Sequence, residues 1–281
     1  MIDYSEEREN GNPYGHLWSV RLGHSHIPKT AGQSLGLLIS EAWGLRYRSV
    51  GKLVRQDFIG ETIDDEGSEF NALLVDVSFL TGHVKPSLLR ELGRTKVFSV
   101  LRNPFERHLS LFAFGHLLRA QGVMSPILAS KLDSPEQWIA HTADGMLKHL
   151  SNPDPIEKTQ TKARKRKTDD ETADEIRMAL EQLDFFFLGT DVQLMLDTLF
   201  STGYLPRPWR ARPVNATNLG ELGPVVRWDR LLLSIKEHNQ LDHKLVQEAS
   251  SLSKGLYAGG ALECSDSKLF AMAEKYGLRL T

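Results

Sequence analysis

The sequence predicts an α/β fold in which a central parallel sheet is flanked by helices. Two strand-to-helix steps carry this prediction: the apolar run Lys96–Leu101 leads to a helix opened by Pro104, and the run Phe185–Gly189 leads to a helix with an apolar stripe. The 281 residues are 41% hydrophobic and 25% charged, which is ordinary for a globular protein with a large core. We expect one domain over residues 1–281, with residues 1–19 as an N-terminal extension.

The stretch from His26 to Leu35 is predicted to form a strand end, a tight turn and a helix start. A weak strand over Val20–Ile27 precedes the turn, and Gln33–Trp43 carries the apolar stripe of a helix packed on a sheet. A helix N-terminus attracts anions because its first N–H groups lack intrahelical partners and its peptide dipoles add partial positive charge. A charge, two hydroxyl donors and a permissive glycine are added by Lys29, Thr30, Ser34 and Gly32. This chemistry is typical of a phosphate or sulfate site.

A second anion site is predicted where the strand Lys96–Leu101 ends. Arg102 follows that strand directly, and Ser110 lies two turns along the helix that is expected to run from Pro104 to about Arg119. A guanidinium fork with a nearby hydroxyl suits a terminal phosphate. Two anion sites at the carboxyl ends of apolar strands indicate one ligand with negative charge at both ends.

The two motifs, His-Ile-Pro-Lys-Thr-x-Gly-x-Ser-Leu and Leu-Arg-x-Pro-x-x-Arg-x-x-Ser, resemble the paired nucleotide motifs of carbohydrate sulfotransferases. That group includes heparan sulfate 2-O- and 6-O-sulfotransferases and their bacterial relatives, and the resemblance covers about residues 20–250. It implies a P-loop-like three-layer fold and 3′-phosphoadenosine 5′-phosphosulfate (PAPS) as the donor. It also implies that Arg102 and Ser110 hold the 3′-phosphate, and that the 5′-phosphosulfate is held by Lys29, Thr30, Ala31, Gly32, Gln33 and Ser34. Gln33 departs from the relatives, which often carry Thr or Ser there, although its amide can still donate a hydrogen bond.

His83 is the predicted general base. The apolar element Asn71–Leu80 ends in Thr81-Gly82-His83, and ligands of open α/β sheets lie beyond the carboxyl ends of the strands. An unperturbed histidine pKa of about 6.5 leaves the ring partly neutral at cytosolic pH. The resemblance also implies a histidine in a Gly-His segment between the two motifs. The alternative is a structural histidine that caps a turn.

Three side chains near the motifs keep two interpretations each. His24 and His26 alternate in the first predicted strand, so they share a face and could chelate a metal. Since no cysteine or carboxylate cluster completes such a site, we expect no metal. Arg107 either reaches the nucleotide or pairs with a carboxylate.

Two segments, residues 121–170 and 204–218, are expected to contain the loops that contact acceptor and donor. A helix is predicted in the first segment, from the N-cap Ser134 to about Leu150. The basic run Lys158–Lys167 in the same segment either contacts an anionic substrate or forms a solvated loop.

In the segment 204–218, Asn215 is predicted to bind the donor, and the candidates for substrate contact are Trp209, Arg210 and Arg212. The alternative is a surface linker held by its prolines. Further helices are predicted over Ala173–Leu183, Leu231–Glu237 and Asp242–Ser251. Asn239-Gln240-Leu241-Asp242 resembles the closing motif of the family, and the stripe of Leu269, Met272 and Tyr276 is expected to serve packing.

Composition narrows the class of protein. A formal net charge of −2 argues against a chain that mainly coats nucleic acid, and the single cysteine, Cys264, excludes an intrachain disulfide and fits a reducing compartment. No stretch approaches eighteen apolar residues, and the acidic and polar start at Asp3 does not resemble a signal peptide. We expect a cytoplasmic, bacterial enzyme, in contrast to the Golgi-anchored animal members of the resembled family.

The expected activity is transfer of a sulfuryl group from PAPS to an acceptor hydroxyl, on a carbohydrate or glycolipid, with His83 as base and Lys29 stabilising the leaving oxygen. One alternative is a P-loop kinase that uses ATP and magnesium. Its signature, Gly-x-x-x-x-Gly-Lys-Ser/Thr, is absent, since Pro28 precedes the lysine. The other alternative is an inactive module that binds a nucleotide or glycan. The acceptor and the oligomeric state stay open.

Overall fold

The computed structural model describes residues 21–43, 47–49, 79–91, 93–151, 168–212, 219, 223–258 and 265–281. The N-terminal extension over residues 1–19, the run Lys158–Lys167, Asn215 and Cys264 lie outside the described residues, as does most of the element predicted over Asn71–Leu80.

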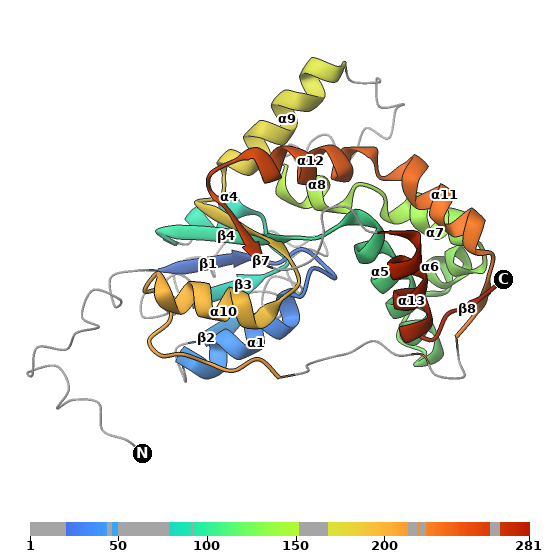
Figure 1. The fold of residues 1–281 in the computed structure, drawn as a ribbon, viewed down its shortest axis with the longest axis horizontal. Helices are drawn as coiled ribbons and strands as arrows, with labels where there is room; N and C mark the ends of the chain where they lie inside the picture. Colours follow the sequence, from blue (N-terminus) through green and yellow to red (C-terminus); the bar gives the residue numbers. More distant parts are fainter. Residues whose placement is uncertain are drawn as a thin grey trace, which may run out of the picture.

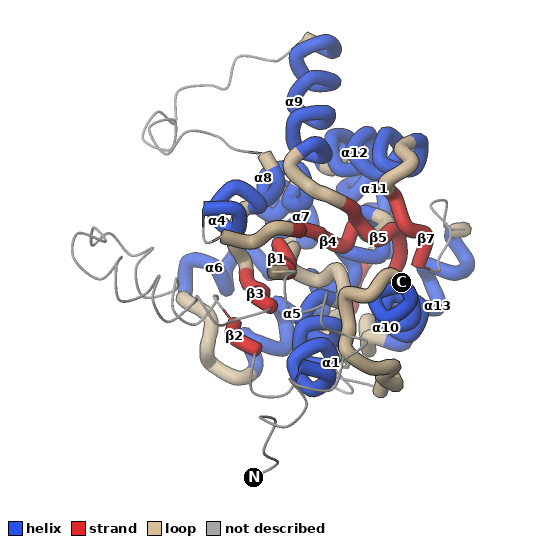
Figure 2. Tube along the Cα trace, turned by 90° about the vertical axis from the view of Figure 1, so that its left-hand side faces the viewer, coloured by secondary structure: helices blue, strands red, loops and turns tan. Residues whose placement is uncertain are grey.

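The strands of the described residues are β1 Leu22–Ser25, β2 Tyr47–Ser49, β3 Phe79–Gly82, β4 Lys96–Leu101, β5 Phe185–Gly189, β6 Val225–Val226, β7 Gly255–Ala258 and β8 Arg279–Leu280. Six of them form one sheet in the order β2-β3-β1-β4-β5-β7, and every neighbouring pair is parallel (Figure 2). The predicted central parallel sheet is therefore confirmed. Its edge strand β7 is not among the strands predicted from the sequence.

The helices of the described residues are α1 Gly32–Trp43, α4 Pro86–Glu91, α5 Pro104–Ala120, α6 Pro126–Ser130, the 3₁₀ helix η4 Lys131–Asp133, α7 Pro135–Thr142, α8 Gly145–Leu150, α9 Asp169–Glu181, α10 Val192–Ser201, α11 Trp228–His238, α12 Gln240–Ser251 and α13 Asp266–Lys275. Of the predicted helices, α1, α5, α10, α11 and α12 are confirmed. In the segment 121–170, where one helix was predicted, the described residues form α6, η4, α7 and α8, followed by the start of α9.

Alternate side chains of the strands enter two apolar cores on opposite faces of the sheet. On β4, Val97 and Leu101 pack into the core beneath α4, α8, α9 and α12. Phe98 and Val100 point the other way, into the core covered by α1 and α10. Figure 1 shows helices on both sides of the sheet, so the flanking layers predicted for an α/β fold are confirmed.

A third apolar core lies beside the sheet, between α5, α7, α11 and α13 (Figure 1). Phe112 of α5, Trp138 of α7, Ile235 of α11 and Leu269 of α13 are all buried in it. The C-terminal helix α13 packs on α5, the helix that follows β4. Residues near the chain's C-terminus therefore lie close to the end of β4.

Strand register brings the ends of three strands to one edge of the sheet. Ser25, the last residue of β1, pairs with Gly82 of β3 on one side and Ser99 of β4 on the other. The chain segments that follow β1, β3 and β4 therefore emerge next to one another. Residue 26, His83 and Arg102 begin those segments.

The single helix predicted from Ser134 to Leu150 is wrong, because it is two helices, α7 and α8. Its start is confirmed, since Ser134 is the N-cap and its hydroxyl accepts a hydrogen bond from the Gln137 N–H over 3.2 Å. Asp144 breaks the helix by adopting the left-handed conformation, with φ 48°. Asp242, far along the chain, then caps the new helix, and the local sequence carries no sign of this long-range cap.

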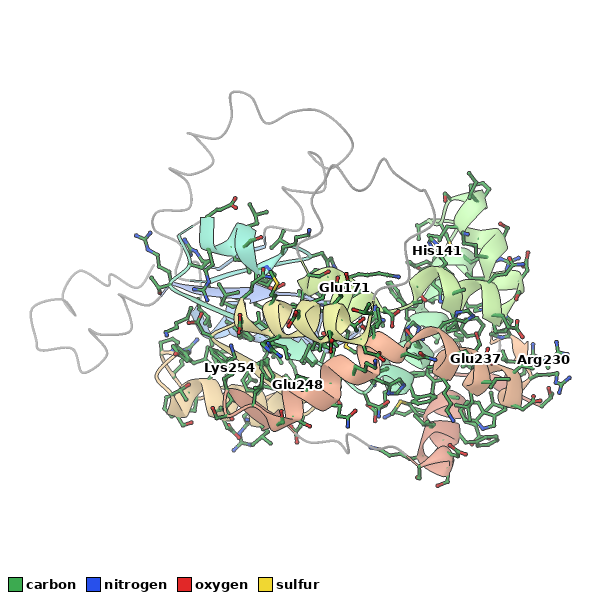
Figure 3. All side chains as sticks on the ribbon, turned by 90° about the horizontal axis from the view of Figure 1, so that it is seen from above. His141, Glu171, Arg230, Glu237, Glu248 and Lys254 are labelled. Carbon is green, nitrogen blue, oxygen red and sulfur yellow. The ribbon has the colours of Figure 1, made fainter. Side chains whose placement is uncertain are left out.

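Helix α9 begins at Asp169, four residues before the predicted start at Ala173. The reason is a capping box, in which Thr168 and Glu171 each bind the backbone N–H of the other. At the other end of α9, the Lys254 ammonium donates to the carbonyls of Leu180 and Leu183, each over 3.1 Å. Glu171 and Lys254 are labelled in Figure 3. Both ends of α9 thus have side-chain partners.

Two aspartates cap each other's helix where α8 and α12 begin. The Asp144 carboxylate accepts from the N–H groups of Leu241 and Asp242, and the Asp242 carboxylate accepts from those of Met146 and Leu147. Arg107 of α5 lies 3.7 Å from Asp242, and both side chains are almost fully buried. Burial raises the pKa of Asp242, and the charge of Arg107 opposes that rise. Of its two proposed roles, Arg107 thus takes the carboxylate partner.

We predict that Asp242→Ala lowers the free energy of unfolding by about 3–5 kcal/mol, because it removes two helix-capping bonds and leaves the buried Arg107 without its carboxylate. Urea denaturation followed by circular dichroism measures this change. Asp229→Ala is the matched control: that aspartate pairs with Arg227 on the surface, so its removal should leave the free energy of unfolding close to that of the wild type. A cost below about 1 kcal/mol for Asp242→Ala would contradict the structural role.

Candidate functional site

The turn that links β1 to α1, residues 26–31, is the centre of the candidate site, and we call it the lysine turn. Lys29 and Ala31 both adopt left-handed backbone conformations, with φ of 66° and 68°. Each such conformation costs a non-glycine residue about 1–2 kcal/mol. Left-handed residues alternating along a turn make successive N–H groups converge, and such concavities bind anions. The strained turn is therefore a candidate anion site.

Every carbonyl from residue 26 to residue 29 accepts a hydrogen bond from a side chain. The pairs are His26 O with His83 Nδ1 at 2.8 Å, Ile27 O with Thr30 Oγ1 at 2.9 Å, Pro28 O with Arg107 Nε at 3.2 Å, and Lys29 O with Arg102 Nη1 at 3.2 Å. Three of these donors come from outside the turn. They hold the carbonyls in place while the turn adopts its strained conformation.

Helix α1 starts at Gly32, directly after the turn, and its first intrahelical bond runs from the Leu35 N–H to the Ala31 carbonyl. Helix geometry therefore leaves the N–H groups of residues 32–34 without carbonyl partners in the helix. The expectation that Thr30 donates to a ligand through its hydroxyl is not supported, because that hydroxyl donates to Ile27 O. The side chain of Gln33 lies outside what the structure describes, and Ser34 is half-buried at the third helical position.

Lys29 is partly removed from water. Its ammonium lies 4.3 Å from the centre of the Phe114 ring of α5, a cation–π contact. Burial, assisted by the nearby charge of Arg102, lowers the pKa of Lys29 to about 8. A cation that has lost part of its hydration, beside a second cation, gains more from an anionic ligand than an exposed lysine does.

Arg102 lies next to the turn, as predicted, but most of its donors are in use. Its Nε donates to Glu106 over 3.2 Å and its Nη2 donates to the Tyr276 hydroxyl over 3.2 Å, in addition to the bond with Lys29 O. Glu106 also pairs with Lys268 of α13 at 3.3 Å. The Nη2 of Arg102 also donates to the Met272 sulfur over 3.8 Å, so four of the five N–H donors of the guanidinium have an acceptor and one, on Nη1, is left for a phosphate. Met272 and Tyr276 contact Arg102 and so do more than pack.

Ser110 is buried on α5, one turn beyond Glu106 on the same helix face. Across the described residues, no hydrogen bond joins Ser110 to Arg102, so a direct contact between the two halves of the predicted 3′-phosphate site is not observed. Glu106, Tyr276 and Phe114 are the site residues that sequence reasoning missed. Glu106 follows Arg102 by four residues, in the first turn of α5, and the two side chains form an ion pair across the start of that helix.

His83 is exposed at the end of β3, and its geometry selects one tautomer. Its Nδ1 lies 2.8 Å from the carbonyl oxygen of His26, which can only accept, so Nδ1 carries the proton. In the neutral ring Nε2 then carries the lone pair. The ring also stacks on the ring of His26, with 4.3 Å between centroids. An exposed, oriented imidazole whose Nε2 carries the lone pair can take a proton from a ligand.

The remaining histidines beside the turn are buried and neutral. Burial lowers the pKa of His24 to about 3, of His26 to about 2 and of His149 to about 4, with smaller effects from neighbouring positive charges. His24 and His26 do lie together, with ring centroids 5.6 Å apart, but the Thr81 hydroxyl lies 2.8 Å from His24 Nδ1. Across the described ranges, no group of three or more His, Cys, Asp or Glu side chains is arranged to hold a metal.

The Pro- and Arg-rich segment after α10 is described only to residue 212. Trp209 packs against the core under α1 and α10, and the Arg207 guanidinium lies 4.5 Å from its ring centre. The side-chain amide of Gln193 donates to the Trp209 carbonyl and accepts from the Ala211 N–H. Arg210 and Arg212 are exposed, and no described contact joins them to the lysine turn. The prediction for Asn215 stays untested.

Neither a protein-family model nor a curated protein matches this sequence. Among the helices that the structure describes, none has both the length and the hydropathy needed to cross a bilayer.

We predict that acid destabilises the protein through His24 and His26. Both have a folded-state pKa far below the unfolded value of 6.5, so below pH 6.5 the unfolded chain binds protons that the folded chain does not. The contribution of the two neutral histidines to the free energy of unfolding is therefore fully present above pH 6.5. Below that pH the free energy of unfolding falls, by up to about 1.4 kcal/mol per pH unit for each histidine. Urea denaturation at a series of pH values between 7 and 4 measures the slope.

His24→Asn should reduce that slope by up to about 1.4 kcal/mol per pH unit, because asparagine does not titrate. An unchanged slope in His24→Asn would mean that His24 does not titrate differently in the two states.

Proposed function

We propose that this protein is a PAPS-dependent sulfotransferase with a P-loop-like fold, which transfers a sulfuryl group to a hydroxyl of a carbohydrate or glycolipid. The observation that carries the proposal is the set of side chains gathered on the lysine turn. Lys29 belongs to the turn, and Arg102 and His83 are both hydrogen-bonded to its carbonyls. An anion-binding turn, a cation and an oriented base are the groups that sulfuryl transfer needs.

The donor end of the reaction is assigned to the turn and the start of α1. The N–H groups of residues 32–34 and the Lys29 ammonium would hold the 5′-phosphosulfate, and Arg102 would reach the 3′-phosphate with its remaining Nη1 donor. PAPS, when bound, supplies the sulfuryl group and carries the leaving oxygen. Lys29 would stabilise the charge that develops on that oxygen, because a fixed cation in a partly dry site acts without reorganisation.

The acceptor end is assigned to His83. Its Nε2 would take the proton of the acceptor hydroxyl while that oxygen bonds to sulfur and the sulfur–oxygen bond to the 5′-phosphate breaks. The hydrogen bond from Nδ1 to His26 O would stabilise the imidazolium that forms, since the carbonyl accepts from either protonation state. The products are a sulfate ester and 3′-phosphoadenosine 5′-phosphate, with the proton on His83.

The alternatives are a kinase and a non-catalytic binding module. A kinase would need ATP and magnesium, whereas a module would bind the bisphosphate and transfer nothing to any acceptor. The order of strands and the position of the turn after β1 are compatible with a sulfotransferase, a kinase and a binding module alike. The proposed activity is favoured over the module because a cation, Lys29, and an exposed histidine, His83, occur together at the lysine turn.

The deciding experiment is calorimetric binding of 3′-phosphoadenosine 5′-phosphate, compared with ATP plus magnesium. We expect the bisphosphate to bind preferentially, and Lys29→Met and Arg102→Ala each to weaken it by about 1–3 kcal/mol, the contribution of a charge-assisted contact. Arg119→Ala is the matched control on α5, because Arg119 pairs with Asp133 on the surface. Preference for ATP plus magnesium, or no nucleotide binding, would rule out the sulfotransferase proposal.

A second prediction follows from the pKa of Lys29, which is lowered to about 8. Lys29 loses its charge as pH rises through that value, so affinity for the bisphosphate should fall by about tenfold between pH 7 and pH 9. The phosphates do not contribute, because their second ionisation, with a pKa of about 6, is complete above pH 7. Lys29→Arg should abolish the fall, since a guanidinium stays charged. An equal fall in both proteins would exclude Lys29 as its cause.

A further inference from the structure

Six aromatic rings form a continuous stack across the central sheet, and we call them the ring column. Neighbouring centroids are 5.3, 5.0, 4.7, 5.6 and 4.3 Å apart, and neighbouring planes differ by at most 26°. In order, the members are Tyr204, Phe185, Phe98, His24, His26 and His83. The column therefore runs from the core under α10 to the exposed candidate base.

Strand register explains the middle of the column. Phe185 pairs with Phe98, and Phe98 pairs with His24, on three adjacent parallel strands. Side chains at paired positions point to the same face, and strands lie about 4.8 Å apart, close to the separation of stacked rings. The sheet thus sets the spacing of these rings. His26 then carries the stack past the end of β1 to His83.

Two different contacts join His83 to His26. Its Nδ1 bonds to the His26 carbonyl at 2.8 Å, and its ring lies on the His26 ring at 4.3 Å between centroids. The hydrogen bond selects the tautomer, and the stacked face restricts rotation about the side-chain torsions that would break that bond. We propose that His26 is a positioning residue for His83, acting through its ring to keep the Nε2 lone pair directed at the acceptor.

This inference rests on the proposed function for its consequence in catalysis, but the orientation itself can be measured without turnover. The charge state of the ring column also suits the positioning of His83. Burial keeps His24 and His26 uncharged, with pKa values of about 3 and 2, so the column adds no positive charge beside His83 when that ring accepts a proton. An aromatic ring without nitrogen atoms should therefore replace His26.

The test compares His26→Leu with His26→Phe. Both keep the backbone carbonyl that accepts from His83, but only phenylalanine keeps a ring to stack on. The first readout is long-range ¹H–¹⁵N correlation of the His83 ring in the full-length protein, which distinguishes a proton on Nδ1 from one on Nε2. We expect wild type and His26→Phe to carry it on Nδ1, and His26→Leu to give a mixture of both tautomers.

The second readout is desulfation of PAPS in the presence of a panel of glycoside acceptors, with binding of 3′-phosphoadenosine 5′-phosphate measured beside it. The rate in His26→Leu should fall by about 10- to 100-fold, as expected for a misplaced catalytic group, while the affinity changes less than twofold. His26→Phe should restore most of the rate. His116→Leu, at a half-buried histidine that contacts Phe112 on α5, is the control and should keep the wild-type tautomer and rate.

An unmixed Nδ1 tautomer in a folded His26→Leu protein would overturn the positioning role, as would a normal rate. Folding of each variant is checked by thermal denaturation, and if the leucine variant does not fold, His26→Met supplies the ring-free side chain. Failure of the wild type to bind the bisphosphate would instead overturn the proposed function, and the tautomer measurement would still decide the role of His26.

Discussion

The conformation of the lysine turn depends on one constraint: four consecutive carbonyls, from His26 to Lys29, are each bound by a side chain. The donors from outside the turn come from the end of β3 and from the segment around the start of α5. A turn with two left-handed non-glycine residues would relax if these bonds were absent, because each such residue costs about 1–2 kcal/mol. The sheet register that brings the three strand ends together is therefore also what keeps the turn strained.

The elements that the sequence predicts well are those specified by local signals. The apolar runs of β4 and β5 and the Pro-started α5 need no distant partner to be recognised, and each lies where it was predicted. Features that depend on distant residues were missed. The break between α7 and α8 depends on Asp242, 96 residues beyond Met146, and β7 is a short edge strand stabilised by pairing with β5. Neither carries a periodicity or cap of its own.

In the candidate site, likewise, the positions of the main residues could be predicted from the sequence, whereas their individual contacts could not. Lys29, His83 and Arg102 could be expected to meet because each follows a strand of one parallel sheet, and the carboxyl ends of such strands share an edge. The roles of individual donors could not be predicted. Thr30 donates into its own turn, and Arg102 is bound by Glu106 and by Tyr276 of the C-terminal segment. These choices depend on packing between α5 and α13, which a one-dimensional pattern does not contain.

The charges around the turn explain why an anion would complete the site. The charge of Arg102 lowers the pKa values of Lys29 and Arg107, and of the three side chains Arg102 and Arg107 are buried and Lys29 is half-buried. Arg102 pairs with Glu106, which it shares with Lys268, and Arg107 pairs with Asp242. The Lys29 ammonium lies over the Phe114 ring, and a ring face offsets less of the cost of burying an ammonium than a full negative charge does. Burial and the charge of Arg102 lower the pKa of Lys29, and an anion bound by the N–H groups at the start of α1 would oppose that shift.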